Sequence, residues 1–579
     1  MKKIITLFAL LCTVFTLSAG PIGESRAREI AEEFFTLNTT RSAGGLELEW
    51  AGDAITDDMV IASKLDKSLM YIYNLTGRGG YVVVAGDDSV APIVAFSFDA
   101  PFDKDNMADA TKAILDGWCK EIGNARMTKR SIDSTPLALT RAEELIYDTA
   151  IWNQTEPYNR EAPVYDGYRC YTGCVATALS IICYYNRWPE SGVGTTEAYT
   201  YIDYGDVERY IEANTLGRTY NYNNMLADYN NGFTNAQGNA VAALMKDIGT
   251  AVQMMYHYTG SGAMDAYALR GITNHFRYNK GAKLEFREGY SYKEWNAVLK
   301  QNLKSCGPTY YSGASADGGG HAFVVDGYVG DYFHFNFGWG GANNGYFLTP
   351  NITYYQGQMA MFNLTPDRDG SSQCVDNLVL CSASNADGEK VLRGIYSESV
   401  LYQVGVDEEY RIGGFYNFGP RPFNGTVNLV HCTKDGEWKE VLFTFEIADL
   451  DIHGFTYHPT FERLALSQSI ETGDRLRIYY CSNDSNEWQW AKRYDNAAAN
   501  EIILCATPEE VAEAIGFHYD KESGKIYIDT TNAIQIDMDN GWGTGAFKSH
   551  TRVGVPLSEG EHILKISSGG EPYILYIKR

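Results

Sequence analysis

The stretch TGCVATALSIICYYNRWP, residues Thr172–Pro189, places a cysteine directly after a glycine and at the start of a long apolar run. Val175, Ala178 and Ile182 recur at helical spacing and a Trp-Pro pair ends the run, so we expect a buried helix that begins at Cys174. Free backbone N–H groups and the positive end of the helix dipole meet at such a position and favour a thiolate, with a pKa lowered to ~3.5–7.5. Cys174 is therefore either a packed thiol or a nucleophile, and a nucleophile needs a base.

His321 has the most suggestive surroundings of the histidines in the same part of the chain. It stands in GGGHAFVVDGY, a glycine-rich approach followed by a buried strand, and a second strand follows in YFHFNF. If the hairpin is centred between Tyr328 and Val329, His321 and Asn336 are cross-strand partners on one face. This pairing depends on the register, because a slip of one residue turns a side chain to the other face. His334 shares the face of Asn336 and is a weaker rival as the base.

These residue types fit nucleophilic acyl chemistry. A cysteine attacks a carbonyl as its thiolate, a histidine takes and returns the proton, and an amide oxygen can orient the imidazole. The sequence therefore predicts a Cys–His–Asn site.

Composition limits the other functions. The formal net charge of the 579 residues is −25, and such a surface repels phosphate backbones and anionic lipids, so we expect no nucleic-acid partner. Lys2 and Lys3 precede an apolar run and the small residues Ser18-Ala19-Gly20, which predicts a signal peptide over residues 1–20 and export from the cell. That run is too short to span a membrane, and no later segment is long enough.

Cysteine spacing argues against a metal site. Ten cysteines remain after the signal peptide, no CxxC pair occurs, and no Cys/His cluster has zinc-ligand spacing, so we expect neither a metal nor another cofactor. The same count is too low for a disulfide framework.

The chain is expected to be an α+β protein of several domains. A helix at Glu24–Leu37 and strands at 69–75, 80–85 and 93–98 indicate a compact front domain. Short alternating strands at 426–430, 441–447 and 475–481 are typical of a β-sandwich. The expected order is a front domain at 21–141, a domain carrying the cysteine at 142–366, an Ig-like β-sandwich at 367–506 and a small β-module at 507–579, with an exposed linker at 129–141.

Several ordered motifs resemble the streptopain family of papain-like bacterial cysteine proteases. They are WNQTEPYN, TGCVATA, GGHAFVVDGY and FHFNFGWGG, between Trp152 and Gly345. The resemblance implies a two-lobed papain-like domain in which Cys174 is the nucleophile, His321 the base and Asn336 the orienting residue. Gln154 would join the Cys174 backbone N–H in an oxyanion hole.

The resemblance also implies a substrate cleft and a zymogen. Trp339 would shield the catalytic pair, and Ser261, Gly262 and Gly320 would line the cleft. Phe337 departs from the tryptophan expected there and keeps the apolar wall without the indole N–H. The stretch YVVVAGDDSVAPIVAFSF resembles the family's propeptide, so residues 21–141 would inhibit the enzyme until removed. The substrates would be proteins or peptides.

Two other functions fit parts of the pattern. A transglutaminase-like acyl transferase also uses a cysteine at a helix start and a distant histidine, but it needs an aspartate downstream of the histidine, where this chain has Asn336. An inactive protease domain that serves binding or adhesion would have no need of Cys174, His321 and Asn336.

Overall fold

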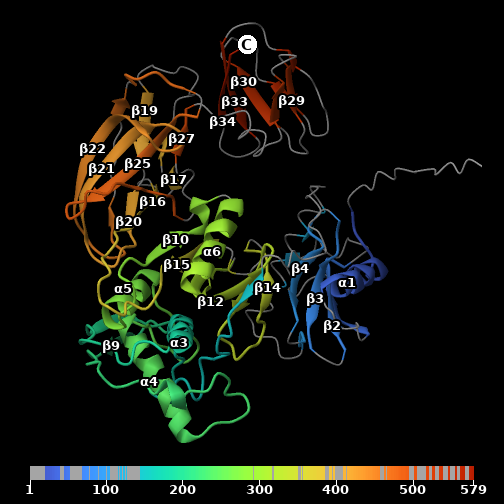
Figure 1. Cartoon of the computed structure of the whole chain (residues 1–579), viewed down its shortest axis with the longest axis vertical. Coiled ribbons are helices and arrows are strands. Elements are labelled where there is room, and N and C mark those ends of the chain that lie inside the picture. Colours follow the sequence, from blue (N-terminus) through green and yellow to red (C-terminus); the bar gives the residue numbers. More distant parts are fainter. Residues whose placement is uncertain are drawn as a thin grey trace, which may run out of the picture. The chain divides into compact units, whose positions relative to one another are not determined.

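A computed structural model gives the structure of the chain (Figure 1). It describes most of residues 144–384, with breaks at 291, 316–318, 350–353 and 355, and shorter runs between residues 20 and 126 and between 390 and 578. The expected linker and nearly all of the expected signal peptide lie outside the described residues. The chain forms two compact units, one made of residues 1–94, 99–106 and 115–138, and the other of residues 95–98, 107–114 and 139–579.

The first unit packs a helix against antiparallel strands. Helix α1 (Glu24–Asn38) buries one face through Ala27, Ile30, Ala31, Phe34 and Phe35, which recur at the spacing that predicts an amphipathic helix. Strands β1 (Leu46–Gly52), β2 (Met70–Leu75) and β3 (Tyr81–Ala85) pair in that order, and β4 (Ile93–Ser97) follows along the chain. The helix and the three strands predicted here are confirmed.

The second unit begins with a sheet that carries helices on both faces. In β11 (Thr309–Ala314), Tyr311 receives a hydrogen bond from Trp295 of α6 (Tyr292–Cys306). The preceding residue, Tyr310, donates to Asp265 of α5 (Asp265–His275). Neighbouring residues of a strand point to opposite faces, so α6 covers one face of the sheet and α5 the other. The strand order is β14-β13-β12-β11-β15-β10, with β5 paired to β12. The bounds are β5 (Glu144–Ile146), β10 (Lys283–Phe286), β11 (Thr309–Ala314), β12 (Gly320–Val329), β13 (Tyr332–Asn336), β14 (Gly345–Phe347), β15 (Gln356–Phe362), α3 (Cys174–Asn186), α4 (Asn235–Ala251), α5 (Asp265–His275) and α6 (Tyr292–Cys306).

Helix α3 is the central helix of this part of the chain. All ten residues from Val175 to Tyr184 are buried, as the apolar run predicts. The helix ends where Arg187 takes a left-handed conformation and its N–H and the next one bond back to Tyr184 and Cys183. The predicted buried helix beginning at Cys174 is therefore confirmed.

The hairpin β12–β13 does not have the register expected from the sequence. Its turn lies at Gly330-Asp331, Val329 pairs with Tyr332, and Asn336 pairs with Val324 after a shift between Val325 and Gly327. The prediction that His321 and Asn336 face each other is wrong, because the hairpin is centred between Gly330 and Asp331, two residues later than expected, and the register shifts between Val325 and Gly327. His321 instead pairs with Gly313 of β11.

Two small hairpins lie before the helices. One is formed by β6 (Val164–Tyr165) and β7 (Tyr168–Arg169), the other by β8 (Tyr199–Ile202) and β9 (Glu208–Ile211). Arg209 joins them through an ion pair with Asp166, and its guanidinium lies 4.2 Å from the centre of the Tyr165 ring. The hairpins therefore lie side by side. A 3₁₀ turn at Tyr222–Asn224 (η3) follows them, and a second at Arg287–Gly289 (η4) precedes α6.

The region after residue 370 consists of strands. One sheet has the order β22-β21-β25-β26 with β27 on β25, and another has the order β17-β16-β20-β23. Side chains of both sheets, among them Leu380, Phe415, Val427 and Ile478, share one hydrophobic core. The predicted strands at 426–430, 441–447 and 475–481 are present, while the boundaries of the β-modules stay a prediction. The bounds are β16 (Leu378–Ser384), β17 (Lys390–Arg393), β18 (Ile395–Ser397), β19 (Glu408–Ile412), β20 (Gly414–Asn417), β21 (Phe423–Cys432), β22 (Trp438–Leu450), β23 (Phe455–Thr456), β24 (Glu462–Leu464), β25 (Arg475–Ser482), β26 (Gln489–Trp490) and β27 (Glu501–Ile503).

The last strands form two further small sheets, with the orders β28-β29-β32 and β31-β30-β33-β34. Their bounds are β28 (Phe517–Asp520), β29 (Lys525–Ile528), β30 (Ile534–Met538), β31 (Gly545–Phe547), β32 (Val555–Pro556), β33 (Glu561–Ser567) and β34 (Tyr573–Lys578).

Among the described residues, no helix is both long and apolar enough to cross a membrane. Among the described residues, the cysteines at positions 170, 174, 183, 306, 374, 432 and 481 carry free thiols.

Candidate active site

Cys174 is the first residue of α3 and is held there by its glycine neighbour. Gly173 has φ of 89°, which favours glycine, and a Cβ at this position would lie 2.4 Å from the sulfur of Met254. Burial raises the pKa of the Cys174 thiol and outweighs the hydrogen bonds from the backbone of Ala322 and Val175. The lowered pKa expected from the helix start is therefore wrong for this form of the chain, because desolvation exceeds the effect of the helix end.

His321 is the second residue of β12 and has one polar contact. Its Nε2 lies 2.9 Å from the carbonyl oxygen of Phe337. A carbonyl only accepts, so Nε2 carries the proton and Nδ1 is the nitrogen that remains to take one. Burial lowers the pKa of His321 to about 4, although the Phe337 carbonyl acts in the opposite direction. The imidazole is therefore neutral at physiological pH.

Aromatic rings enclose the imidazole. Trp339 stacks on it with ring centres 4.6 Å apart and planes inclined by 22°. Tyr354 and Phe323 approach at 5.0 and 5.6 Å. Trp339 is thus placed where the resemblance puts the shielding residue, and the ring cluster explains the desolvation of His321.

No hydrogen bond joins Cys174 to His321 in the part of the chain that the structure describes. The pKa of the cysteine is raised and that of the histidine is lowered, so both groups are neutral. A thiolate–imidazolium pair is therefore not formed in this structure.

Asn336 does not contact the imidazole. Its amide nitrogen donates to the carbonyl of Ala150 at 2.9 Å and to the Thr149 hydroxyl at 3.0 Å, and its oxygen accepts from the N–H of Gly338 at 3.2 Å. These bonds hold both neighbours of Phe337 in place. The acceptor that orients His321 is a backbone carbonyl, which sequence reasoning missed because any residue supplies one.

Gln154 lies beside the start of α3. Its carbonyl accepts from the N–H of Thr172 at 3.1 Å, two residues before Cys174, and its own N–H binds the side chain of Asn153 at 2.7 Å. The motif WNQTEPYN is therefore tied to the loop that carries the cysteine, as the predicted oxyanion role requires.

The other predicted cleft residues divide into two groups. The Ser261 hydroxyl donates to the carbonyl of Tyr171, and a Cβ on Gly173 would lie 3.1 Å from the Ser261 carbonyl, so Ser261 and Gly262 are close to the cysteine loop. Gly320 precedes His321 and is exposed, and a Cβ there would meet open space. The place of Gly320 in the cleft stays a prediction.

His334 is engaged elsewhere. Its Nδ1 bonds the carboxylate of Asp326, whose other oxygen accepts from the hydroxyl of Thr149. Thr149 in turn accepts from Asn336. The rival histidine is thus part of a polar chain that also holds Asn336.

Comparison with known proteins bears on this arrangement. Residues 152–347 match the Peptidase C10 family, and residues 19–122 match the Spi protease inhibitor family. The first match contains Cys174, His321 and Asn336. The chain carries a cysteine peptidase domain that resembles those of the streptopain family.

Individual relatives are similar over 60–62% of the chain. The thiol protease/hemagglutinin PrtT of Porphyromonas gingivalis is 32% identical over 365 residues, which is 60% of this chain and 41% of that protein. Streptopain of Streptococcus pyogenes is 29% identical over 385 residues, 62% of this chain and 93% of streptopain. The chain thus spans less than half of PrtT and nearly all of streptopain.

Two solved structures from Prevotella intermedia are also similar to the peptidase. A fragment of prointerpain A is 27% identical with a TM-score of 0.44, covering 52% of this chain and 97% of the fragment. Active interpain A is 29% identical with a TM-score of 0.36, covering 40% of this chain and 99% of interpain A.

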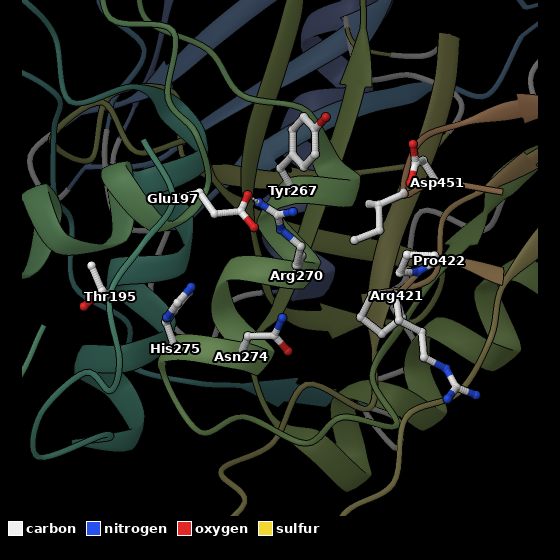
Figure 2. Close-up of a pocket in the computed structure, with 11 residues that line it drawn as sticks. Thr195, Glu197, Tyr267, Arg270, Asn274, His275, Arg421, Pro422 and Asp451 are labelled. Atoms are coloured by element: carbon white, nitrogen blue, oxygen red, sulfur yellow. Dashed lines mark hydrogen bonds and ion pairs between the residues drawn. The ribbon is translucent and has the colours of Figure 1, made fainter. Parts of the chain in front are cut away.

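A pocket of about 700 Å³ lies away from the candidate catalytic residues (Figure 2). Within it Arg270 pairs with Glu197 at 2.8 Å, and Arg421 pairs with Asp376 outside the lining. Both guanidinium groups are already paired with carboxylates, so neither is available to act on a substrate in this pocket. We therefore place the candidate peptidase site at Cys174. The lining residues are Thr195, Glu197, Tyr267, Arg270, Asn274, His275, Pro420, Arg421, Pro422, Asp451 and Ile452.

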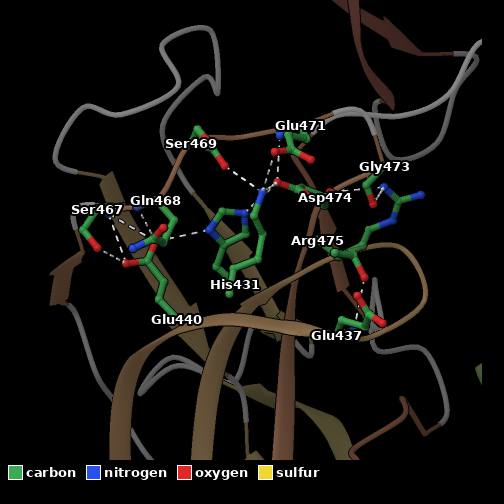
Figure 3. A network of polar contacts seen from close by, with 12 residues as sticks. His431, Glu437, Glu440, Ser467, Gln468, Ser469, Glu471, Gly473, Asp474 and Arg475 are labelled. Carbon is green, nitrogen blue, oxygen red and sulfur yellow. Dashed lines mark hydrogen bonds and ion pairs between the residues drawn. The ribbon is translucent and has the colours of Figure 1, made fainter.

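Another buried histidine lies in the β-rich region of the chain (Figure 3). The side chain of His431 in β21 has Nδ1 3.2 Å from Glu440 and Nε2 2.8 Å from Asp474. Lys439 also donates to Asp474, at 2.8 Å. Among the described residues, no three or more His, Cys, Asp or Glu side chains are grouped so as to hold a metal ion, this cluster included.

Proposed function

We propose that the chain is a secreted cysteine endopeptidase made as a zymogen, with Cys174 as nucleophile and His321 as base. The observation that carries this is the bond from His321 Nε2 to the Phe337 carbonyl. It fixes the tautomer and leaves Nδ1 as the proton acceptor for a sulfur at the start of α3. Export rests on the signal-like residues 1–20.

The reaction would proceed through a thioester. Nδ1 of His321 takes the thiol proton, and the sulfur of Cys174 attacks the peptide carbonyl. The negative charge on oxygen is met by the Cys174 N–H and the Gln154 side chain. The C–N bond then breaks as His321 returns the proton to the leaving amine. Water, deprotonated by His321, hydrolyses the thioester, releases the acid and restores the thiol.

Asn336 would act as a positioning residue. Its three hydrogen bonds fix residues 336–338, and with them the Phe337 carbonyl that orients His321. This role replaces the direct contact with the imidazole that the sequence predicted.

The chain would be held inactive by its front domain. The match of residues 19–122 to a protease inhibitor supports an inhibitory propeptide at 21–141, released by cleavage in the 129–141 linker. A papain-like peptidase domain at 142–366 and β-modules at 367–506 and 507–579 complete the proposal.

The acyl-transferase alternative is less favoured. It needs an aspartate on the catalytic histidine, and Asp326 bonds His334 instead of His321.

Autoprocessing tests the proposal. The chain from residue 21 onward is expressed as wild type, Cys174→Ala and Cys183→Ala, and is followed by gel and mass spectrometry under reducing conditions. Cys183 is buried in the same helix and serves as the control. Wild type and Cys183→Ala should lose the residues up to the linker and Cys174→Ala should not. Equal processing of all three proteins would refute the proposal. It would also be refuted if none of them were processed and the wild type showed no peptidase activity after an added protease had trimmed the linker.

A further inference from the structure

The exposed apolar side chains of this chain are concentrated near the two small hairpins. Seven of the thirteen large hydrophobic residues that are exposed in the described structure lie between positions 164 and 264. Scattered exposed apolar residues are ordinary, but a gathering of this kind marks a surface that binds something. The seven are Val164, Tyr168, Ile202, Tyr204, Val207, Tyr210 and Met264.

Four rings of this region form a continuous line, here called the tyrosine row. Tyr204 contacts His257 with ring centres 5.7 Å apart, His257 stacks on Tyr258 at 4.2 Å, and Tyr258 contacts Tyr168 at 5.3 Å. The two end rings are the most exposed, at 71% for Tyr204 and 64% for Tyr168. The row spans at most about 15 Å, the length of four or five residues of an extended peptide.

The row begins at the candidate cleft. A Cβ on Gly262 would lie 3.7 Å from the Tyr204 hydroxyl, and the backbone N–H of His257 donates to the Ser261 hydroxyl at 2.9 Å. The chain also runs directly from Tyr168 to Cys174, and Tyr171 on the way donates to the His257 carbonyl at 3.1 Å. A peptide that passes Ser261 and Gly262 can therefore continue onto the row.

The charge beside the row is negative. Asp166 and Asp206 are exposed at the tips of the two hairpins. Of the two arginines on these hairpins, Arg209 is already bound to Asp203 at 2.6 Å and to Asp166 at 3.2 Å, and Arg169 donates to the backbone carbonyls of Arg160 and Ala162. No ion pair of Asp206 occurs within the described residues. Exposed tyrosine faces attract cations, and carboxylates next to them add to the attraction.

We propose that the tyrosine row is an exosite for a basic segment of an extended substrate, several residues from the bond that is cut. This inference rests on the peptidase function proposed above. Lysine or arginine side chains of the substrate lie over Tyr204 and Tyr168 and near Asp206. The exosite adds affinity for long basic substrates and leaves the cleavage of short ones unchanged.

Matched peptides test the exosite with the active enzyme obtained from the full chain. A core peptide that the enzyme cleaves is compared with versions carrying a four-residue lysine-rich or glutamate-rich extension on either side. At low salt, kcat/KM for the lysine version should exceed that for the glutamate version about tenfold on one side. The preference should vanish at 1 M salt, where the Debye length is about 3 Å.

Three variants locate the effect. Tyr204→Ser and Tyr168→Ser should each reduce the preference about threefold or more while kcat/KM for the core peptide stays within twofold, which also shows that they fold. Tyr210→Ser is the control: Tyr210 is exposed on the same hairpin, but alternation puts it on the face opposite Arg209. It should leave the preference intact. Asp206→Asn should weaken the salt dependence.

Binding to full-length Cys174→Ala, followed by fluorescence anisotropy, separates the two proposals. If the protein prefers the lysine peptide and Tyr204→Ser removes that preference, the exosite is supported. This holds even if no peptide is cleaved, although the peptidase proposal then fails. Cleavage of the core peptide with no effect of either extension overturns the exosite and leaves the peptidase function. A change of oligomeric state in Tyr204→Ser, with no change in preference, also overturns it and makes the row a contact between copies.

Discussion

His321 and His431 are both buried, yet their surroundings give them opposite properties. His321 is 7% exposed, meets one backbone carbonyl and is otherwise surrounded by aromatic rings. His431 is 0% exposed and lies between the carboxylates of Glu440 and Asp474. The pKa of each carboxyl is lowered, so both are ionised at neutral pH and act only as acceptors.

The difference shows what a buried histidine needs in order to do chemistry. Each ring nitrogen of His431 is already bonded to a carboxylate, so neither is available to another group. His321 has one nitrogen occupied by an acceptor and one without such a partner among the described contacts. Burial alone does not mark a catalytic histidine; a single orienting acceptor does.

The largest effect is expected from removing the base. His321→Gln should lower kcat/KM for a peptide at least about 10³-fold, since general acid–base catalysis contributes ~10²–10⁴ and no other group of the proposed mechanism deprotonates the Cys174 thiol. His431→Gln should retain activity within about twofold at a temperature where both variants are folded. Equal losses in the two variants would remove the functional distinction between the histidines.

The next effect concerns stability. His431→Gln leaves two buried carboxylates without their shared donor, and breaking such a pair costs about 3–5 kcal/mol. Hydrogen exchange in β21, β22 and β25 should therefore become faster by roughly two orders of magnitude or more, while exchange in α3 is unchanged. Unchanged exchange in these strands would mean that the cluster contributes nothing to their stability.

Asn336→Ala should have a smaller effect on activity. One hydrogen bond is worth roughly 1 kcal/mol, so a loosened Phe337 carbonyl should lower kcat about tenfold with little change in KM. The acid limb of the pH–rate profile should shift, because the orientation of His321 changes. Phe337→Trp should stay within about threefold, since the acceptor is the backbone. If the rate fell by the same factor at every pH, with no shift of the acid limb, Asn336 would have a structural role only.

The smallest effect is on acid stability. Burial alone would raise the pKa of Glu440, but bonds from Ser467, Gln468 and His431 lower it from 4.5 to about 2. A lowered carboxyl pKa stabilises the fold above pH 4.5, and this contribution is lost as the pH falls towards 2. Wild type should lose about 1–2 kcal/mol more than Glu440→Gln over that range, measured by exchange in β22. If the stability of wild type and of Glu440→Gln changed with pH by the same amount, the lowered pKa of Glu440 would be contradicted.

The sequence predicts the elements of this fold better than their register. The buried run after Cys174 and the alternating strands have clear periods, and they appear where expected. The hairpin register was missed because a two-residue turn at Gly330-Asp331 and a shift after Val325 leave no pattern in YVGDYF. Because of this error in the register, the sequence paired His321 with Asn336, whereas the structure does not.

The contacts that set protonation were not predictable either. The acceptor of His321 is a carbonyl, which has no signature in the sequence. His431 meets Asp474 from 43 residues away, and only its cross-strand pairing with Glu440 is local. The low pKa expected at Cys174 failed because the helix end is readable from sequence and the depth of burial is not.

Strand β5 has a practical consequence for handling this enzyme. It pairs with Gly327–Val329 of β12, six or more residues along that strand from His321, or about 20 Å. A chain end created by a cut in the 129–141 segment would thus be anchored at the opposite end of the strand from the imidazole. A purification tag or a fluorescent label attached at that end would sit clear of the scissile bond, and the trimmed enzyme could be immobilised there and still be used.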